Sequence, residues 1–166
     1  TAALVVGMTL PAFALDWYIE DGDISISAGE TGNHVTQGSK TEENDTDTVI
    51  KSKDSSTASS NTVTIDAGEG KTVNVTLENV TINVDEGYVH GYDPNAYKTA
   101  VSVTGSGNTN IELNGNNTLT SGYGHAGLEH NKTDDSGTLT IQDEKNDDGS
   151  AKGSASDTTG SLTANG

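Results

Sequence analysis

Apolar and polar residues alternate along several short stretches of this chain with a period of two. The clearest of these runs lie at 61–67, 72–83, 100–104, 111–119 and 137–141, and shorter pieces at 24–27 and 160–164 follow the same pattern. Such alternation is typical of β-strands that bury one face. The pattern therefore predicts an all-β protein.

Two of the runs repeat one phrase. VTLENVTI occupies 75–82, and IELNGNNTL occupies 111–119, where Gly115 makes the second copy one residue longer. In each copy an Asn, Asn79 or Asn117, stands at the predicted bend between two apolar rows. A repeated strand phrase with an Asn at its corner predicts the stacked coils of a β-solenoid, in which corner Asn side chains bond backbone groups and each other. The spacing of successive apolar anchors fits a coil of about 20 to 25 residues with loops of different lengths.

The composition agrees with a thin core. Hydrophobic residues make up 30% of the 166 residues and aromatic residues 4%, and Thr, Ser, Asn and Gly take their place. A solenoid needs little apolar mass, because each coil buries its inner row against the next coil. We expect Trp17, the only Trp, to cap an open end of this core, and the alternative is that it stacks on a sugar face.

Two segments interrupt the alternation. The composition of residues 29–60 predicts an irregular first coil with a long exposed loop, in which Val35–Thr36 and 48–50 form strand fragments. Residues 85–98 read DEGYVHGYDPNAYK and are predicted to project from the coils as a second loop. Loops on a rigid scaffold carry function more often than the scaffold itself, so the second loop is the better candidate for ligand contact.

The N-terminal residues 1–14 read TAALVVGMTLPAFA, an apolar run that ends in the small pair Ala12 and Ala14. This is the pattern of the C-terminal part of a signal peptide that is cleaved after Ala14, and the run is too short to span a bilayer. The alternative is an apolar first strand or a buried helix. The signal peptide predicts a secreted or cell-surface protein with a mature domain at 15–166, and we expect the solenoid to be truncated at both ends.

The charge of the chain limits its partners. Eight Lys and no Arg stand against 25 Asp and Glu, which gives a net charge of −17. This balance argues against phosphate contacts with nucleic acid and against an anionic membrane surface. The chain has no Cys, so disulfides and thiolate metal sites are excluded. The acidic excess fits either a solvated surface or the capture of Ca²⁺ by clustered carboxylates.

A succession of phrases carries a resemblance to a known family. These are WYIEDGDISI, NTVTIDAGEGKTVNVTLENVTI, AVSVTGSGNTNIELNGNNTLTSGYGHAGLEH, GTLTIQD and GSLTANG, which cover most of 16–166. Together they resemble the secreted carbohydrate-binding β-helix proteins of clostridia and related gut bacteria. The resemblance implies a right-handed parallel β-helix, related in fold to pectate-lyase-type polysaccharide lyases. It also implies non-catalytic, surface-located binding of plant cell-wall polysaccharide, including acidic sugars, with Ca²⁺ on the helix.

Candidate binding residues lie mainly in the second loop. Aromatic rings offer apolar faces with a polar tip, which suit a sugar ring, although the same tyrosines would also serve to pin the loop to the scaffold. The candidates for carbohydrate binding are Tyr88, Tyr92, Tyr97 and Tyr123.

Candidate Ca²⁺ ligands come from two carboxylate-rich places. The run E-x-N-x-D-G at 144–149 has the spacing at which a Ca²⁺ loop begins, but it starts with Glu and has Ala155 at the twelfth position, so an ordinary polar turn is the favoured explanation. If the ligand is a polyuronate, a bridging cation is favoured, because a chain of this charge repels a polyanion and has no Arg to clamp it. The candidate metal ligands are Asp85, Glu86, Asp93, Glu144, Asn146 and Asp148.

The sequence offers little for catalysis. A polysaccharide lyase needs a base beside a bound cation, and Lys71 and Lys98 are the only bases near the centre of the chain. The four His residues have no metal-binding spacing. We therefore expect a monomeric, non-enzymatic protein whose partner is a polysaccharide. The alternatives are an adhesin-like structural stalk or surface interaction protein, and a polysaccharide lyase.

Overall fold

The structure, a computed structural model, describes residues 15–87, 97–131, 137–143 and 160–166. The regular elements in these ranges are β-strands, apart from one turn of 3-10 helix at Ile19–Asp21, so the all-β prediction is confirmed. The strands are β1 (Leu15–Tyr18), β2 (Ile24–Ala28), β3 (Asn33–Gln37), β4 (Lys40–Asp45), β5 (Thr48–Lys51), β6 (Val63–Asp66), β7 (Thr72–Glu78), β8 (Thr81–Asn83), β9 (Val101–Thr104), β10 (Asn108–Thr120), β11 (Leu128–His130), β12 (Leu139–Asp143) and β13 (Gly160–Asn165).

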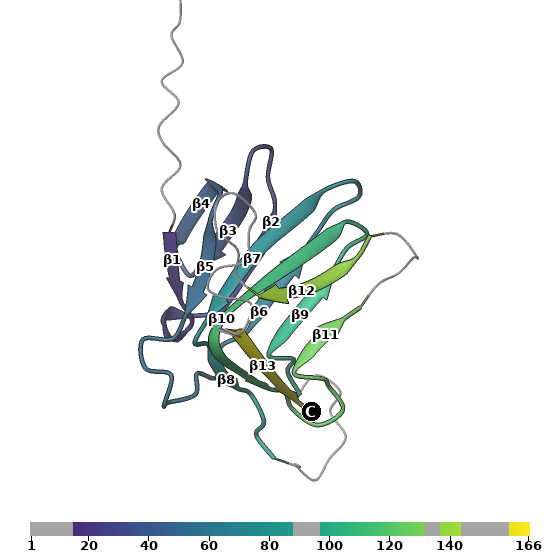
Figure 1. Cartoon of the computed structure of the whole chain (residues 1–166). Helices are drawn as coiled ribbons and strands as arrows, with labels where there is room; N and C mark the ends of the chain where they lie inside the picture. The colour runs from purple at the N-terminus through teal and green to yellow at the C-terminus, as the bar shows by residue number, and fades with distance from the viewer. Residues whose placement is uncertain (1–14, 88–96, 132–136, 144–159) are drawn as a thin grey trace, which may run out of the picture.

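Most strand pairs are parallel, and they form two sheets (Figure 1). Sheet A has the order β1-β5-β7-β10-β12, and all of these neighbours are parallel. The long strand β10 bends, and its second half pairs in parallel with β8 and β13, which form a branch of sheet A. Sheet B has the order β11-β9-β6-β2-β3-β4. Its first four strands pair in parallel, whereas β3 pairs antiparallel with both β2 and β4.

From β7 onward the chain visits these ladders in a fixed sequence. It passes from sheet A at β7 to the branch at β8 and to sheet B at β9. It then repeats the circuit through the two halves of β10 and through β11, and it enters sheet A and the branch again at β12 and β13. Each strand therefore lies beside the strand one circuit earlier, which explains why parallel pairing dominates.

The alternating apolar residues of these strands fill the space between the ladders. In sheet A the inward row pairs Ile50 with Leu77, and in sheet B it pairs Ile26 with Ile65 and Val103. These side chains are at most 2% exposed, which confirms that the alternation marks a buried face in these strands.

The corner between β7 and β8 differs from the prediction. Asn79 is a non-glycine residue in the left-handed region, with φ of 53°, and the residue that lies over it in β10 is Gly115, with φ of 65°. Asn117, predicted as the counterpart of Asn79, is instead a buried residue that is 1% exposed. A stacked Asn pair does occur, but within sheet A, where Asn110 Nδ2 donates to Asn74 Oδ1 at 2.8 Å.

The segment 29–60 is more ordered than the sequence predicted, because three strands occupy 33–51. The sequence did not indicate these strands, because several polar residues of the segment are buried and have their hydrogen bonds made within the protein. Asn33, which is 5% exposed, donates to Thr48 Oγ1 at 2.9 Å and to Asn74 O at 2.7 Å. The β3–β4 hairpin extends sheet B beyond β2 by antiparallel pairing.

The hairpin also covers Trp17, which is fully buried. The Trp17 Nε1–H donates to Asp45 Oδ2 at 2.8 Å, and Lys40 Nζ lies 3.9 Å from the centre of the Trp ring. Trp17 therefore lies at the N-terminal end of the core, as predicted, but the hairpin covers it from outside.

The predicted signal segment, 1–14, lies outside the described residues, and β1 begins at Leu15. No helix among the residues that the structure describes is long and apolar enough to cross a membrane.

Candidate functional site

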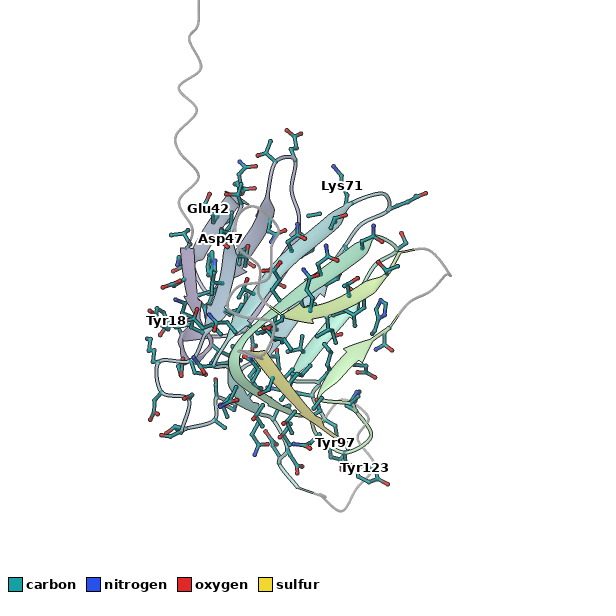
Figure 2. The ribbon with its side chains drawn as sticks, viewed as in Figure 1. Tyr18, Glu42, Asp47, Lys71, Tyr97 and Tyr123 are labelled. Carbon is teal, nitrogen blue, oxygen red and sulfur yellow. The ribbon has the colours of Figure 1, made fainter. Side chains whose placement is uncertain are left out.

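Two of the four predicted sugar-stacking tyrosines lie side by side. The ring centroids of Tyr97 and Tyr123 are 5.7 Å apart with an interplanar angle of 57°, and Figure 2 shows both at the end of the molecule opposite the β3–β4 hairpin. Tyr123 is 63% exposed, the largest exposed fraction of a large hydrophobic side chain among the described residues. Tyr88 and Tyr92 lie outside the described residues.

A close approach of two backbone segments places the two rings together. The Gly122 N–H donates to Lys98 O at 2.9 Å, and a Cβ added to Gly122 would lie 3.3 Å from the Cβ of Tyr97. A larger residue at 122 would therefore separate the segments that carry Tyr97 and Tyr123. The turn is closed by His125 N–H, which donates to Gly122 O at 3.1 Å.

A cluster of three polar side chains lies in the same two segments. Thr99 Oγ1–H donates to Glu129 Oε2 at 2.6 Å, and His125 Nδ1 lies 3.1 Å from the same carboxylate oxygen and 3.1 Å from Thr99 Oγ1. All three side chains are partly buried. Because Thr99 precedes β9 and Glu129 belongs to β11, the cluster joins these two neighbouring strands at one edge of sheet B.

The cluster favours the ionised carboxylate of Glu129. Hydrogen bonds from Thr99 and then from His125 lower the pKa of Glu129 below its ordinary value, against the opposing effect of burial. A lowered pKa in the folded state means that the cluster stabilises the fold at pH values above the ordinary pKa of Glu. That contribution is lost as the pH falls through the lowered pKa. Glu129 is thus ionised at neutral pH.

The structure describes two of the six predicted metal ligands, Asp85 and Glu86, and both are exposed. Asp85 takes part in tight turns, since its N–H donates to Asn83 Oδ1 and its Oδ1 accepts from Gly87 N–H, each at 2.9 Å. The other four, Asp93, Glu144, Asn146 and Asp148, lie outside the described residues. Within the described ranges, no three His, Asp or Glu residues are grouped closely enough to hold a metal ion.

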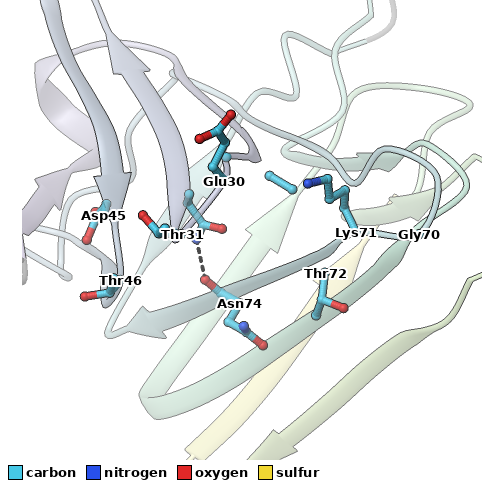
Figure 3. Close-up of a pocket in the computed structure, with 12 residues that line it drawn as sticks. Glu30, Thr31, Asp45, Thr46, Gly70, Lys71, Thr72 and Asn74 are labelled. Atoms are coloured by element: carbon cyan, nitrogen blue, oxygen red, sulfur yellow. Dashed lines mark hydrogen bonds between the residues drawn. The ribbon is translucent and has the colours of Figure 1, made fainter.

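A polar hollow of about 320 Å³ lies between the base of the β3–β4 hairpin and the turn before β7 (Figure 3). Lys71, one of the two candidate bases, lines it together with Glu30 and Asp45. Asp45 is already engaged by Trp17, and Glu30 is exposed on the hairpin base. Lys98, the other candidate base, is an exposed residue beside Tyr97 and does not line this hollow.

The roles of Thr99 and Glu129 were not found by sequence reasoning. The only signal in the sequence was His125 and Glu129, four residues apart in a Gly-rich stretch. In a strand or turn this spacing does not indicate a contact between the two side chains until the partner segment is known. The third member, Thr99, is 30 residues from Glu129 and reaches it only through the parallel pairing of β9 with β11.

No protein-family model, curated protein or solved structure matches this chain.

Proposed function

We propose that this protein is a non-catalytic polysaccharide-binding protein of the cell surface or the secreted fraction, and that Tyr97 and Tyr123 form part of its binding site. The observation that carries the proposal is the tilted tyrosine pair with an exposed Tyr123 ring beside a polar cluster. An exposed ring next to carboxylate and hydroxyl groups provides both an apolar face for a sugar ring and hydrogen-bonding partners for its hydroxyls.

The scaffold that we propose is a right-handed parallel β-helix. The repeated circuit through sheet A, the branch and sheet B supports it, because each circuit lies in parallel register on the one before. The right hand follows from the strong preference of parallel crossover connections for that hand. A rigid stack of strands suits the presentation of loops to an extended polymer.

Two further elements of the proposal rest on the sequence. The apolar run before Leu15 supports export through a signal peptide, and the resemblance to clostridial carbohydrate-binding proteins supports a bacterial cell-surface setting. Ca²⁺-dependent binding of acidic sugars is supported by the carboxylate-rich stretches at 85–93 and 144–148 and by the net charge of −17.

The test is retention of the protein on insoluble polysaccharides, namely cellulose, xylan and cross-linked polygalacturonate, measured with and without a chelator. We expect retention on at least one of them, and we expect Tyr123→Ala to weaken it by about threefold to tenfold, the equivalent of one aromatic contact. Tyr123→Phe should retain most of the affinity, because it keeps the ring.

Tyr18→Ala is the matched control, because Tyr18 lies in β1 on the far side of the molecule, where Lys53 covers its ring at 5.6 Å (Figure 2). If no polysaccharide retains the protein, the proposal is wrong and the adhesin-like stalk is favoured. If pectate develops the absorbance of unsaturated uronates, the protein is a lyase.

A further inference from the structure

The outer face of sheet B carries a row of hydroxyl groups that crosses five strands. Cross-strand register pairs Thr41 of β4 with Thr36, then Ser25, Thr64 and Ser102 in succession. Neighbouring strands lie about 4.8 Å apart, so the row is about 20 Å long. It ends at Glu129 of β11, which belongs to the cluster beside the tyrosine pair.

The outer face of sheet A and its branch is different, because many of its polar side chains bond one another across the strands. Asn110 donates to Asn74 at 2.8 Å, and Asn114 donates to Glu78 Oε2 at 3.1 Å. Further contacts of this kind among the described residues are Gln142 with Glu112 at 3.0 Å, Ser161 with Asn116 at 2.9 Å, Asn165 with Thr120 at 3.4 Å, and Lys51 with Asp16 and Glu78 at 3.2 and 3.3 Å.

In contrast, the five hydroxyls of the sheet B row have no hydrogen-bond partner among the residues that the structure describes. Ser25, Thr64 and Ser102 each lie between buried Ile or Val residues of β2, β6 and β9, so their hydroxyls point away from the core. Thr36 lies between buried Val35 and Gln37, and Thr41 is exposed. Each hydroxyl both donates and accepts. The row is thus a line of hydrogen-bonding groups that is available to a ligand.

The electrostatic character of this face is also distinct. Although the chain carries a net charge of −17, Asp66 is the only charged residue among the outward side chains of β2, β6 and β9. The same strands carry no Lys. A uronate polymer would find no cation on these strands to compensate its carboxylates, whereas a neutral polymer meets no repulsion.

The face is hollowed along this row. Thr36, Ser25 and Thr64 line a depression of about 340 Å³, and Ser27, Asp66 and Thr104 of the neighbouring row line its other side. His34, which lies 2.8 Å from Glu43 on the hairpin, closes the end near β3.

We propose that the outer face of sheet B binds a linear neutral polysaccharide, such as an unsubstituted glucan or xylan, along the row from Thr41 to Ser102, and that it does so without a divalent cation. This inference rests on the proposed function and specifies its ligand class. The sugar hydroxyls exchange hydrogen bonds with the row, and the Tyr97–Tyr123 pair stacks at its end. Acidic polysaccharide bound through Ca²⁺ would use other residues.

The experiment compares retention of four variants on cellulose, xylan and cross-linked polygalacturonate. Thr64→Val removes one hydroxyl from the centre of the row and keeps the shape, so we expect affinity for the neutral polymer to fall by about fivefold. Thr64→Glu fills the hollow with a charge beside Asp66, and we expect a loss of roughly tenfold or more. A chelator should not change retention on the neutral polymer.

Thr140→Val and Thr140→Glu are the matched controls, because Thr140 is an exposed Thr in β12 of sheet A. They should bind like the unmodified protein, and thermal melts should show that all four variants fold. If Thr64→Glu binds a neutral polymer normally, sheet B is not the binding face, although the protein remains a polysaccharide-binding protein. Retention on polygalacturonate alone, with loss on chelation, would overturn the neutral ligand class. Lack of retention on all three polymers would overturn the proposed function as well.

Discussion

Single asparagine residues have very different roles in this protein although the sequence presents them alike. Asn79 lies exposed at a corner, and its Oδ1 accepts from Asn116 N–H at 3.1 Å. Asn117 lies inside the same corner one circuit later, where its Oδ1 accepts from Val80 N–H at 2.9 Å and its Nδ2 donates to Asn114 O and Ser161 O at 3.3 and 3.2 Å. It thereby joins three successive circuits of the chain.

We expect Asn117→Ala to lower the free energy of unfolding by about 2 to 4 kcal/mol, because it leaves buried backbone groups without partners. The measurement is chemical denaturation followed by circular dichroism. Asn116→Ala is the control, since the side chain of Asn116 is exposed and accepts one hydrogen bond, from Ser161 Oγ–H. The stability loss of this variant should be below about 1 kcal/mol. Equal losses for the two variants would contradict the buried role of Asn117.

At the scale of elements, the corners and the hairpin decide how the strands stack. Gly115 has a φ of 65°, and a Cβ at this position would clash with the Asn79 side chain. In the sequence, Gly115 appeared as the additional residue of the second phrase. The strand register shows instead that Gly115 lies at the position equivalent to Asn79, and that the additional residue comes after Gly115. The close stacking of the two corners therefore requires the glycine.

A pair of glycine substitutions separates backbone strain from this clash. Gly38, in the turn between β3 and β4, has a φ of 58°, and a Cβ there would have no atom within 4 Å. Gly38→Ala should cost about 1 kcal/mol of stability from the left-handed conformation alone. Gly115→Ala should cost at least about 1 kcal/mol more, because the Asn79 side chain must move. Denaturation midpoints of the two variants provide the measurement, and equal effects would show that the corners are not tightly stacked.

At the scale of the whole molecule, the acidic surface works against the compact fold. A net charge of −17 on 166 residues causes repulsion between exposed carboxylates, and few cations offset it. Lys51 is one of these, because it lies between Asp16 and Glu78 on sheet A, and its contacts with them raise its pKa despite the opposing effect of burial.

Salt should therefore stabilise the protein. Between about 0.01 M and about 0.5 M sodium chloride, the Debye length falls below the usual spacing of surface charges. The surface repulsion is then almost completely screened. If this screening contributes about 1 kcal/mol, Tm rises by about 2–4 °C. The measurement is a thermal melt at several salt concentrations, with a neutral osmolyte such as sucrose at matched osmolality as the control. A Tm that falls with salt would show that local ion pairs outweigh the net repulsion.

The sequence by itself determined the strands within 24–28, 63–66, 72–83 and 101–120 and the side of each that is buried, because burial of apolar side chains imposes a period of two that can be read without any partner. It also marked Tyr97 and Tyr123 as candidate contacts by their chemistry. It did not show that they lie together, nor the order within 33–51, where buried Asn33 and Asp45 read as loop residues. Only the tertiary structure decided these points and the continuity of the hydroxyl row from Thr41 to Ser102. They depend on the antiparallel register of β2, β3 and β4 and on the parallel register of strands that are far apart in the chain.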